Sequence, residues 1–321
     1  GQGAGLFVQS ATAYISNRQF KNNIAYTGQF DNGAGGGAFV FEDSYGSSIE
    51  NCDFRFNGAQ GYSGYSSYAS SGAGGAGMLK FSQAVINSST FFSNWVGAGG
   101  VQYSSGGAIA VFYDYITDAN VDLPPIITGN RRLRGSGLAG GRRLASVGPN
   151  IRTQRVVSTN SRSRGSNMPF YIEKKRHHHA TSQWKPQGVS DDSRGVPVII
   201  SNCTFLRNAA YGLLCSDSPI PRAGQGGGIS VMGADNPGVE IVSSNFTQNI
   251  AKCDTTGGES SLGGGLAASL YSYVNATLSG FYGNVAWNGV GDDVATTSLD
   301  PNLDTEVNLI DGEFTAPFNS T

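Results

Sequence analysis

One short motif, F-x-x-N, occurs six times along the chain and constrains its fold more strongly than any other feature. The copies begin at Phe20, Phe54, Phe91, Phe205, Phe246 and Phe281 and end at Asn23, Asn57, Asn94, Asn208, Asn249 and Asn284. Two positions after each asparagine stands an alanine or, in one copy, Val96. Such regular recurrence predicts a protein built from structural repeats.

Each copy is preceded by a second motif, in which three small residues come before an apolar one. Residues 36–39 read G-G-A-F, and residues 226–229 read G-G-G-I. The side chains that follow alternate between apolar and other types, as at Ile229 and Val231, which is the pattern of a β-strand. Each unit is therefore predicted to contain two or three short strands separated by turns.

The spacing of the units indicates how they are stacked. Successive phenylalanines are 34, 37, 41 and 35 residues apart, apart from one long interval. A helical solenoid would show apolar stripes about every 3.6 residues and few internal glycines, but this chain has an apolar period of two and 47 glycines. We therefore predict an all-β fold, a parallel β-helix formed as a single-stranded solenoid of about six coils and on the order of 30 Å long.

The repeated residues then have structural roles. Each phenylalanine is expected to point inward and to stack on the phenylalanine of the next coil. Each asparagine is expected to occupy a turn with left-handed φ, with its amide bonded to the amide one coil along. The alanine lets the wall fold back beneath its neighbour, and the glycines serve a second corner where a side chain would clash.

A basic segment interrupts the fourth unit. Residues 124–195 hold 14 Lys and Arg against three acidic residues, a net charge of +11, whereas the remainder holds 7 basic and 20 acidic residues, a net charge of −13. Apolar residues in this segment have no period, so we expect a largely irregular insertion. The chain is thereby divided into residues 1–123 (coils 1 to 4, first part), 124–195 (insertion), 196–298 (coils 4 to 6) and 299–321 (a C-terminal cap or linker).

The densest basic clusters of the insertion are candidates for a binding site. They comprise Arg131, Arg132, Arg134, Arg142, Arg143, Lys174, Lys175 and Arg176. They could bind a polyanion such as an acidic polysaccharide, contact the acidic body of the chain, or be cut by proteases that recognise dibasic sites. A solvated loop is the fourth interpretation.

The four cysteines are too few for a disulfide framework. Cys215 and Cys253 follow the F-x-x-N motif in adjacent coils, so they are predicted to lie at the same corner and to form a disulfide. Cys52 and Cys203 each stand two residues before a phenylalanine, on the inward side of coils that are not adjacent. We expect both to be buried free thiols.

Five N-x-S/T triplets favour a secreted or cell-surface location, although several fall in strand-like stretches. The candidate N-glycosylation sites are Asn87, Asn202, Asn245, Asn275 and Asn319. No apolar run approaches the roughly 18 residues of a membrane helix, so we expect no membrane span in this chain. Its first residues resemble the middle of a coil, which suggests a mature product or a piece of a longer protein.

The pairing of the two motifs resembles the repeats of the polymorphic outer membrane proteins of chlamydiae and of related β-helical surface proteins. Residues 36–39 and 106–109 match the first motif outright, and all six units match the second. The resemblance covers the chain except the insertion and the tail. It implies that the β-helix is right-handed and that its role is extracellular and often adhesive. The triplets and the Arg-rich insertion favour a eukaryotic surface protein, algal or protist, that uses the same repeat.

Parallel β-helices also include pectin lyases and polysaccharide hydrolases, whose sites need two or three carboxylates from consecutive coils on one face. Asp292 and Asp293 form an acidic pair at the far end of the repeats, and no histidine is near them in the sequence. His177, His178 and His179 are adjacent, so they cannot all face one metal ion. We therefore predict no catalytic residue, no metal site and no cofactor.

The sequence thus predicts a non-catalytic extracellular module of a cell-surface scaffold or adhesin. Its expected partners are glycans or other extracellular proteins, bound through the loops and the basic insertion, with no nucleic acid. Residues 60–71 are rich in Tyr, Ser and Gly, a composition typical of adaptable binding surfaces as well as of solvated loops. Two alternatives stay open: a subunit of an extracellular filament or coat that associates end to end, and a polysaccharide lyase or hydrolase.

Overall fold

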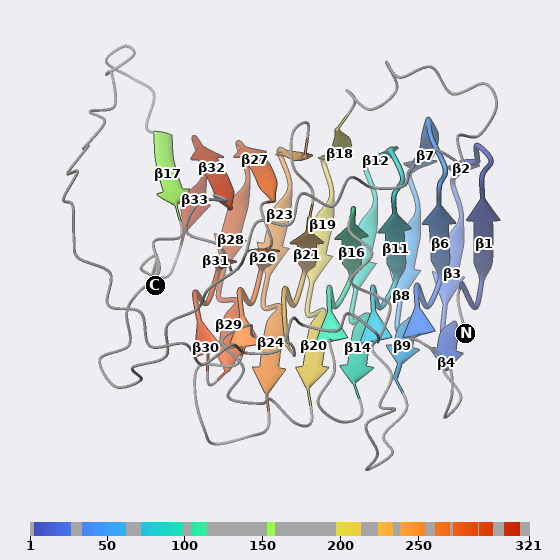
Figure 1. Cartoon of the computed structure of the whole chain (residues 1–321), viewed down its shortest axis with the longest axis horizontal. Helices are drawn as coiled ribbons and strands as arrows, with labels where there is room; N and C mark the ends of the chain where they lie inside the picture. The colour runs from blue at the N-terminus through green and yellow to red at the C-terminus, as the bar shows by residue number, and fades with distance from the viewer. Residues whose placement is uncertain are drawn as a thin grey trace, which may run out of the picture.

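The computed structural model describes residues 3–26, 34–61, 72–98, 104–113, 153–157, 197–212, 224–233, 238–253, 261–269, 272–287, 289–297 and 305–314. Within them the chain is all-β and contains no helix, so the all-β part of the predicted fold class is confirmed. Parallel sheets are stacked as in a solenoid, because each repeat places its strands beside those of the preceding repeat (Figure 1).

We name the sheets A to E in the order in which each repeat visits them. Sheet A contains β5 (Ala34–Gly35), β10 (Gly72–Ala73) and β15 (Ser104–Ser105), and then β25 (Ser261–Leu262) and β30 (Gly289–Val290). Gln225 connects the two groups through bridges to Ser105 and Leu262. Sheet B contains β1 (Leu6–Gln9), β6 (Phe39–Glu42), β11 (Gly77–Lys80), β16 (Ile109–Phe112), β21 (Ile229–Met232), β26 (Leu266–Ser269) and β31 (Val294–Thr297).

Sheets C, D and E complete each repeat. Sheet C contains β2 (Tyr14–Ser16), β7 (Ser47–Glu50), β12 (Ala84–Asn87), β18 (Val198–Ser201), β22 (Val239–Val242), β27 (Tyr273–Thr277), β32 (Glu306–Ile310) and β17 (Thr153–Val157). Sheet D contains β3 (Gln19–Lys21), β8 (Asp53–Arg55), β13 (Thr90–Phe92), β19 (Thr204–Leu206), β23 (Asn245–Thr247), β28 (Gly280–Tyr282) and β33 (Glu313–Phe314). Sheet E contains β4 (Ile24–Tyr26), β9 (Gly58–Gln60), β14 (Trp95–Ala98), β20 (Ala209–Gly212), β24 (Ile250–Cys253) and β29 (Val285–Trp287).

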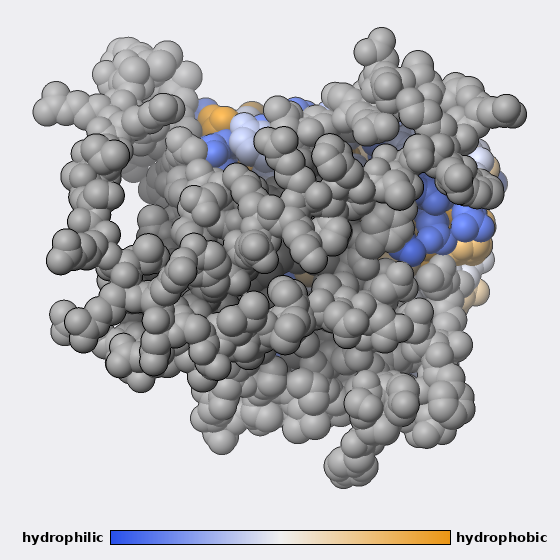
Figure 2. Space-filling view, in the orientation of Figure 1, coloured by the Kyte–Doolittle hydropathy of each residue, from blue (hydrophilic) through white to orange (hydrophobic). Residues whose placement is uncertain are grey.

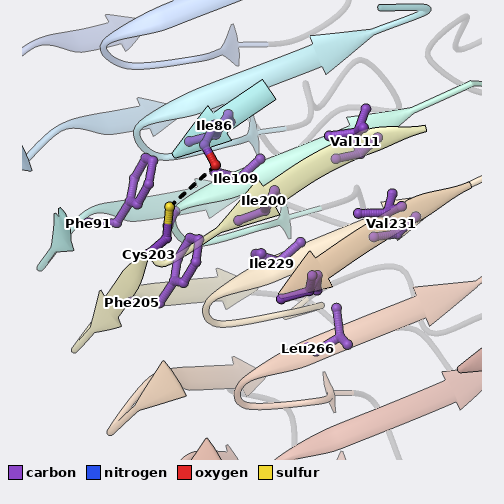
Figure 3. Packing of buried hydrophobic residues seen from close by; sticks show 14 of the residues in the cluster. Ile86, Phe91, Ile109, Val111, Ile200, Cys203, Phe205, Ile229, Val231 and Leu266 are labelled. Atoms are coloured by element: carbon purple, nitrogen blue, oxygen red, sulfur yellow. Dashed lines mark hydrogen bonds between the residues drawn. The ribbon is translucent and has the colours of Figure 1, made fainter. Parts of the chain in front are cut away.

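The motif phenylalanines form one column through the interior. Neighbouring rings are 4.6 to 5.0 Å apart between centroids and within 8° of parallel. The ring spacing matches the distance of about 4.8 Å between adjacent strands, because each ring stands at the same register position in sheet D. Figure 3 shows Phe91 and Phe205 one above the other, beside the isoleucines of sheets B and C.

The motif asparagines form a second column, at the corner between sheets D and E. From the second copy onward, each side-chain oxygen accepts hydrogen bonds from the side-chain amide of the asparagine in the preceding repeat, at 2.8 to 3.0 Å, and from its backbone N–H, at 2.9 to 3.1 Å. In the same copies, from the second onward, the side-chain amide also donates to the backbone carbonyl of the motif phenylalanine in the preceding repeat, at 2.9 to 3.0 Å. The buried corner is thereby fully hydrogen-bonded, as a buried amide requires.

One expectation about this corner is wrong. None of the six motif asparagines has a positive φ; the residue immediately before each one has it instead. These residues are Asn22, Phe56, Ser93, Arg207 and Gln248, with φ between 51° and 56°, and Gly283, with φ 60°. The physical reason is that the residue before the asparagine turns the chain with its side chain outside, so that the asparagine itself can face inward and reach its neighbours.

The stack continues into the tail that we expected to be a cap or linker. There β32 and β33 pair in parallel with β27 and β28, and the Phe314 ring stacks on Phe281 at 5.3 Å. Residues 153–157 of the predicted insertion form β17, which pairs antiparallel with β32 at the end of sheet C. The rest of the insertion lies outside the described residues.

The asparagine column can be tested in the middle and at its end. In Asn208→Leu, the buried backbone and side-chain N–H groups of Asn94 lose their acceptor, so we expect a loss of about 3 kcal/mol or more in the free energy of unfolding. Asn23→Leu is the matched control, because Asn57 keeps the bond from the backbone N–H of residue 23, and its cost should be near 1 kcal/mol. If denaturant unfolding shows that both variants lose the same free energy of unfolding, the column does not stabilise the stack in this way.

Candidate functional site

Sheet E offers the outer face with the most exposed aromatic side chains. Its central residues, from Ala25 to Ala286, point inward and are small, because the wall turns sharply after each asparagine. The residues on either side of them point outward. Three outward aromatics are largely exposed: Tyr26 at 63%, Tyr211 at 42% and Trp287 at 55%.

Strand register aligns these side chains along the stack. The third residue after each asparagine pairs with its counterpart in the next repeat, and this alignment, which we call the sheet E row, consists of Tyr26, Gln60, Gly97, Tyr211, Lys252 and Trp287. The Lys252 ammonium lies 5.5 Å from the centroid of the Trp287 ring, a cation–π distance. The row therefore combines flat rings with groups that can form hydrogen bonds.

A second outward row lies beside the first and includes Trp95, which is half-buried. Its ring covers Gly58 of the preceding repeat, where a Cβ atom would stand 2.4 Å from the ring. Glycine at this position is thus required for the indole to lie flat against the sheet.

The sheet E row stands at the edge where the most variable parts of the repeats begin. Strands of sheet E end just before residues 27–33, 62–71, 99–103, 213–223 and 254–260, and the chain next enters sheet A. These connecting residues, which include most of the predicted Tyr-rich loop, lie outside the described residues. Because all five preceding strands belong to sheet E and run in parallel, the five connections start from the same edge of the stack (Figure 1).

The acidic pair that an enzyme would need has a structural role. The Oδ1 of Asp293 accepts hydrogen bonds from the backbone and the side-chain amide of Asn284, at 3.3 and 2.8 Å, and Asp293 is only 4% exposed. Its neighbour Asp292 accepts a bond from the backbone N–H of Ala286 at 3.0 Å. The pair therefore closes the asparagine column where no seventh asparagine follows.

Cys52 and Cys203 are free thiols and both are buried, which confirms the prediction made for them. The thiol of Cys203 donates to the carbonyl of Ser201 at 3.1 Å and to that of Ile86 at 3.6 Å. Figure 3 shows the second of these bonds. Burial raises the pKa of this thiol to about 11, and it also raises the pKa of the Cys52 thiol. Cys253 is disulfide-bonded, but Cys215 lies outside the described residues, so their pairing stays a prediction.

The glycosylation candidates differ in their surroundings. Asn87 and Asn275 are half-buried within strands of sheet C, whereas Asn202 and Asn245 are exposed. Asn275 also lines a hollow of about 410 Å³ on the outer face of sheet C, together with Glu240, Tyr273 and Asn308. Asn319 lies outside the described residues.

Other predicted residues cannot be placed. The eight basic residues of the clusters and the three histidines lie outside the described ranges. Among described residues, no group of three or more His, Cys, Asp or Glu is arranged to hold a metal ion. In the same part of the chain there is no helix long and apolar enough to cross a membrane.

On the face in Figure 2, the described residues near β1 show hydrophilic and hydrophobic side chains next to one another.

No family model, no curated protein and no solved structure matches this chain. The resemblance to the polymorphic outer membrane protein repeats therefore stays a prediction.

Sequence reasoning missed the sheet E row, although a signal was present. Three of the six residues at the third position after the motif asparagine are aromatic, namely Tyr26, Tyr211 and Trp287. Because strand residues alternate between faces, an inward alanine one position earlier places these side chains outside.

The state of the cysteines can be tested by thiol titration. The native protein at pH 8 should not react with a chromogenic disulfide reagent, because Cys52 and Cys203 are buried and their raised pKa values keep the thiols protonated. Unfolding without a reductant should release two thiols per chain. Release of four would contradict the Cys215–Cys253 disulfide, and fast reaction of the native protein would contradict the burial of the free thiols.

Proposed function

We propose that this protein is a non-catalytic extracellular module of a cell-surface scaffold or adhesin, which binds glycans or other extracellular proteins. The observation that supports this most is the sheet E row, in which Tyr26, Tyr211 and Trp287 remain exposed on a rigid sheet. Tyr and Trp rings give a large contact area with a polar group at one end and lose little conformational entropy on binding.

The geometry of the repeats supports the same role. The phenylalanine column holds the strands of sheet D in register, and the asparagine column holds the corner between sheets D and E, so the strands of sheet E begin from a fixed corner. Connections of 5 to 11 residues then begin at one edge. A rigid framework that carries variable connections on one side is a common arrangement for binding sites.

We propose further that the sheets close into a right-handed parallel β-helix of about six coils. Sheets B, C, D and E receive one strand per repeat in the same order, which a helical path of the chain would produce. The resemblance of the two motifs to those of β-helical surface proteins supports the right-handed sense.

A catalytic role is not proposed, because Asp292 and Asp293 are engaged in closing the asparagine column. The basic clusters of the insertion are proposed as a second contact for acidic glycans, since they contribute to a net charge of +11 over residues 124–195.

Binding can be measured on an array of glycans and extracellular proteins with matched variants. Replacing Tyr26, Tyr211 and Trp287 together by serine should weaken binding at least about tenfold, because exposed aromatics dominate such contacts. The control replaces Phe7, Tyr14 and Leu278, which are exposed apolar residues outside sheet E, and should leave binding unchanged.

A third variant replaces the eight clustered basic residues by glutamine and leaves β17 intact. Weaker binding to acidic glycans alone, restored at low salt, is expected if the insertion adds an electrostatic contact. If this variant loses all binding while the aromatic variant loses none, the insertion and not sheet E is the binding element.

A further inference from the structure

The outer face of sheet D carries one asparagine whose surroundings differ from those of the other described N-x-S/T triplets. Asn245 opens β23, its side chain is exposed, and within the described residues it forms no side-chain hydrogen bond. At the same register position the preceding repeat has Thr204 and the following repeat has Gly280. Thr204 is small, and at Gly280 the ring of Tyr282 fills the place that a Cβ atom would take. The Asn245 side chain is nevertheless exposed to solvent.

The remaining residues of this triplet have the orientation that a modified site needs. Phe246 points into the core, and Thr247 points outward on the same face as Asn245, since alternate residues of a strand share a face. A large group on the Asn245 nitrogen would therefore extend into solvent without disturbing the phenylalanine column.

The two triplets in sheet C have different surroundings. The Oδ1 of Asn87 accepts bonds from Ser201 Oγ and Asn202 Nδ2, at 3.0 and 3.2 Å. The Oδ1 of Asn275 accepts a bond from Asn308 Nδ2 at 3.0 Å, and Asn275 stands between Glu240 and Asn308 in the register. Both side chains are half-buried and held by neighbouring strands, so a bulky group there would have to displace these contacts.

Asn202 is exposed, but the nitrogen that would carry a sugar is already a donor. Its Nδ2 bonds to Asn87 Oδ1, and its backbone is in the left-handed region, with φ 51°. The side chain is thus directed along the turn towards sheet C. Of the four described triplets, Asn245 alone combines an exposed side chain with an amide that has no partner among the described residues.

We propose that Asn245 is an N-glycan acceptor and that the outer face of sheet D carries the glycan. The donor is an oligosaccharide linked to a polyprenyl pyrophosphate, presented by a transferase. The Asn245 Nδ2 forms a bond to the anomeric carbon, the bond from that carbon to the pyrophosphate oxygen breaks, and the nitrogen loses one proton. No oxidation or reduction is involved. Transfer precedes folding, because Phe246 must be withdrawn from the core for the triplet to enter an active site. The folded, secreted protein then retains a glycan only where the fold leaves room for it, so the surroundings of each asparagine determine its occupancy in that protein.

This placement is compatible with binding at sheet E. Sheets D and E are successive walls of each repeat, so a glycan on sheet D would leave the sheet E row accessible. The inference rests on passage through a secretory pathway, which the proposed extracellular role requires, but it does not depend on any particular ligand.

The test is site occupancy in the full chain secreted from a eukaryotic host. Enzymatic release of N-glycans in ¹⁸O-water, followed by peptide mass spectrometry, reports each asparagine separately. Asn245 should be occupied in most molecules, Asn202 in fewer, and Asn87 and Asn275 in hardly any. An unoccupied Asn245 in the folded, secreted protein would overturn the proposal, as would occupancy of Asn87 or Asn275 equal to that of Asn245.

Variants separate the acceptor from effects on folding. Thr247→Ala should remove one glycan from the electrophoretic mass while Asn245 is retained, and Thr247→Ser should keep it. Thr204→Ala, which removes the Asn202 triplet at the same register position, should leave the Asn245 glycan in place. Circular dichroism of the unglycosylated protein made in bacteria checks that each variant folds. Failure of the ligand array with Asn245 occupied would refute only the proposed function.

Discussion

The column of buried amides is the interaction on which the rest of the structure depends. An asparagine side chain carries both a donor and an acceptor, so an identical residue one strand away can satisfy it on each side. The strand spacing of about 4.8 Å brings successive amides to within 3.0 Å of each other in every repeat. Because a buried amide without partners is costly, any slip in register between repeats would leave several groups unsatisfied at once. The column thus fixes the alignment of sheets D and E.

Much of this arrangement could be predicted from the sequence, because the motif repeats side chains that satisfy one another. Phe and Asn at fixed spacing indicate two columns, and alternating apolar residues indicate the strands. The left-handed residue could not be assigned correctly, because its side chain points outward and varies from Phe56 to Arg207. The continuation to Phe314 was missed because Pro317 stands where the seventh motif would have its asparagine. Repeats are recognised by their inward residues, and a terminal repeat can keep only some of them.

The candidate site was harder to predict for the same reason. Outward residues such as Tyr26 and Trp287 are free to differ between repeats, so they do not form a recurring motif. Their alignment is visible only once the register is known. The same freedom allows Asn245 and Asn275, which belong to similar triplets, to have different surroundings. In this fold the inward positions determine the structure, and the outward positions are available for binding and modification.

The end of the asparagine column shows how small a chemical change can end a repeating series of side-chain hydrogen bonds. Asp293, which comes from the glycine-rich motif and not from an F-x-x-N copy, offers Asn284 the same acceptor oxygen that a further asparagine would offer. A carboxylate in place of an amide, however, has no N–H group to pass on to the next position. The column has a direction, because each oxygen accepts hydrogen bonds from the preceding repeat. The exchange of one NH₂ group for an oxygen therefore ends the series of hydrogen bonds at Asp293. Phenylalanine stacking has no such direction, which is why the aromatic column can extend one step further than the amides.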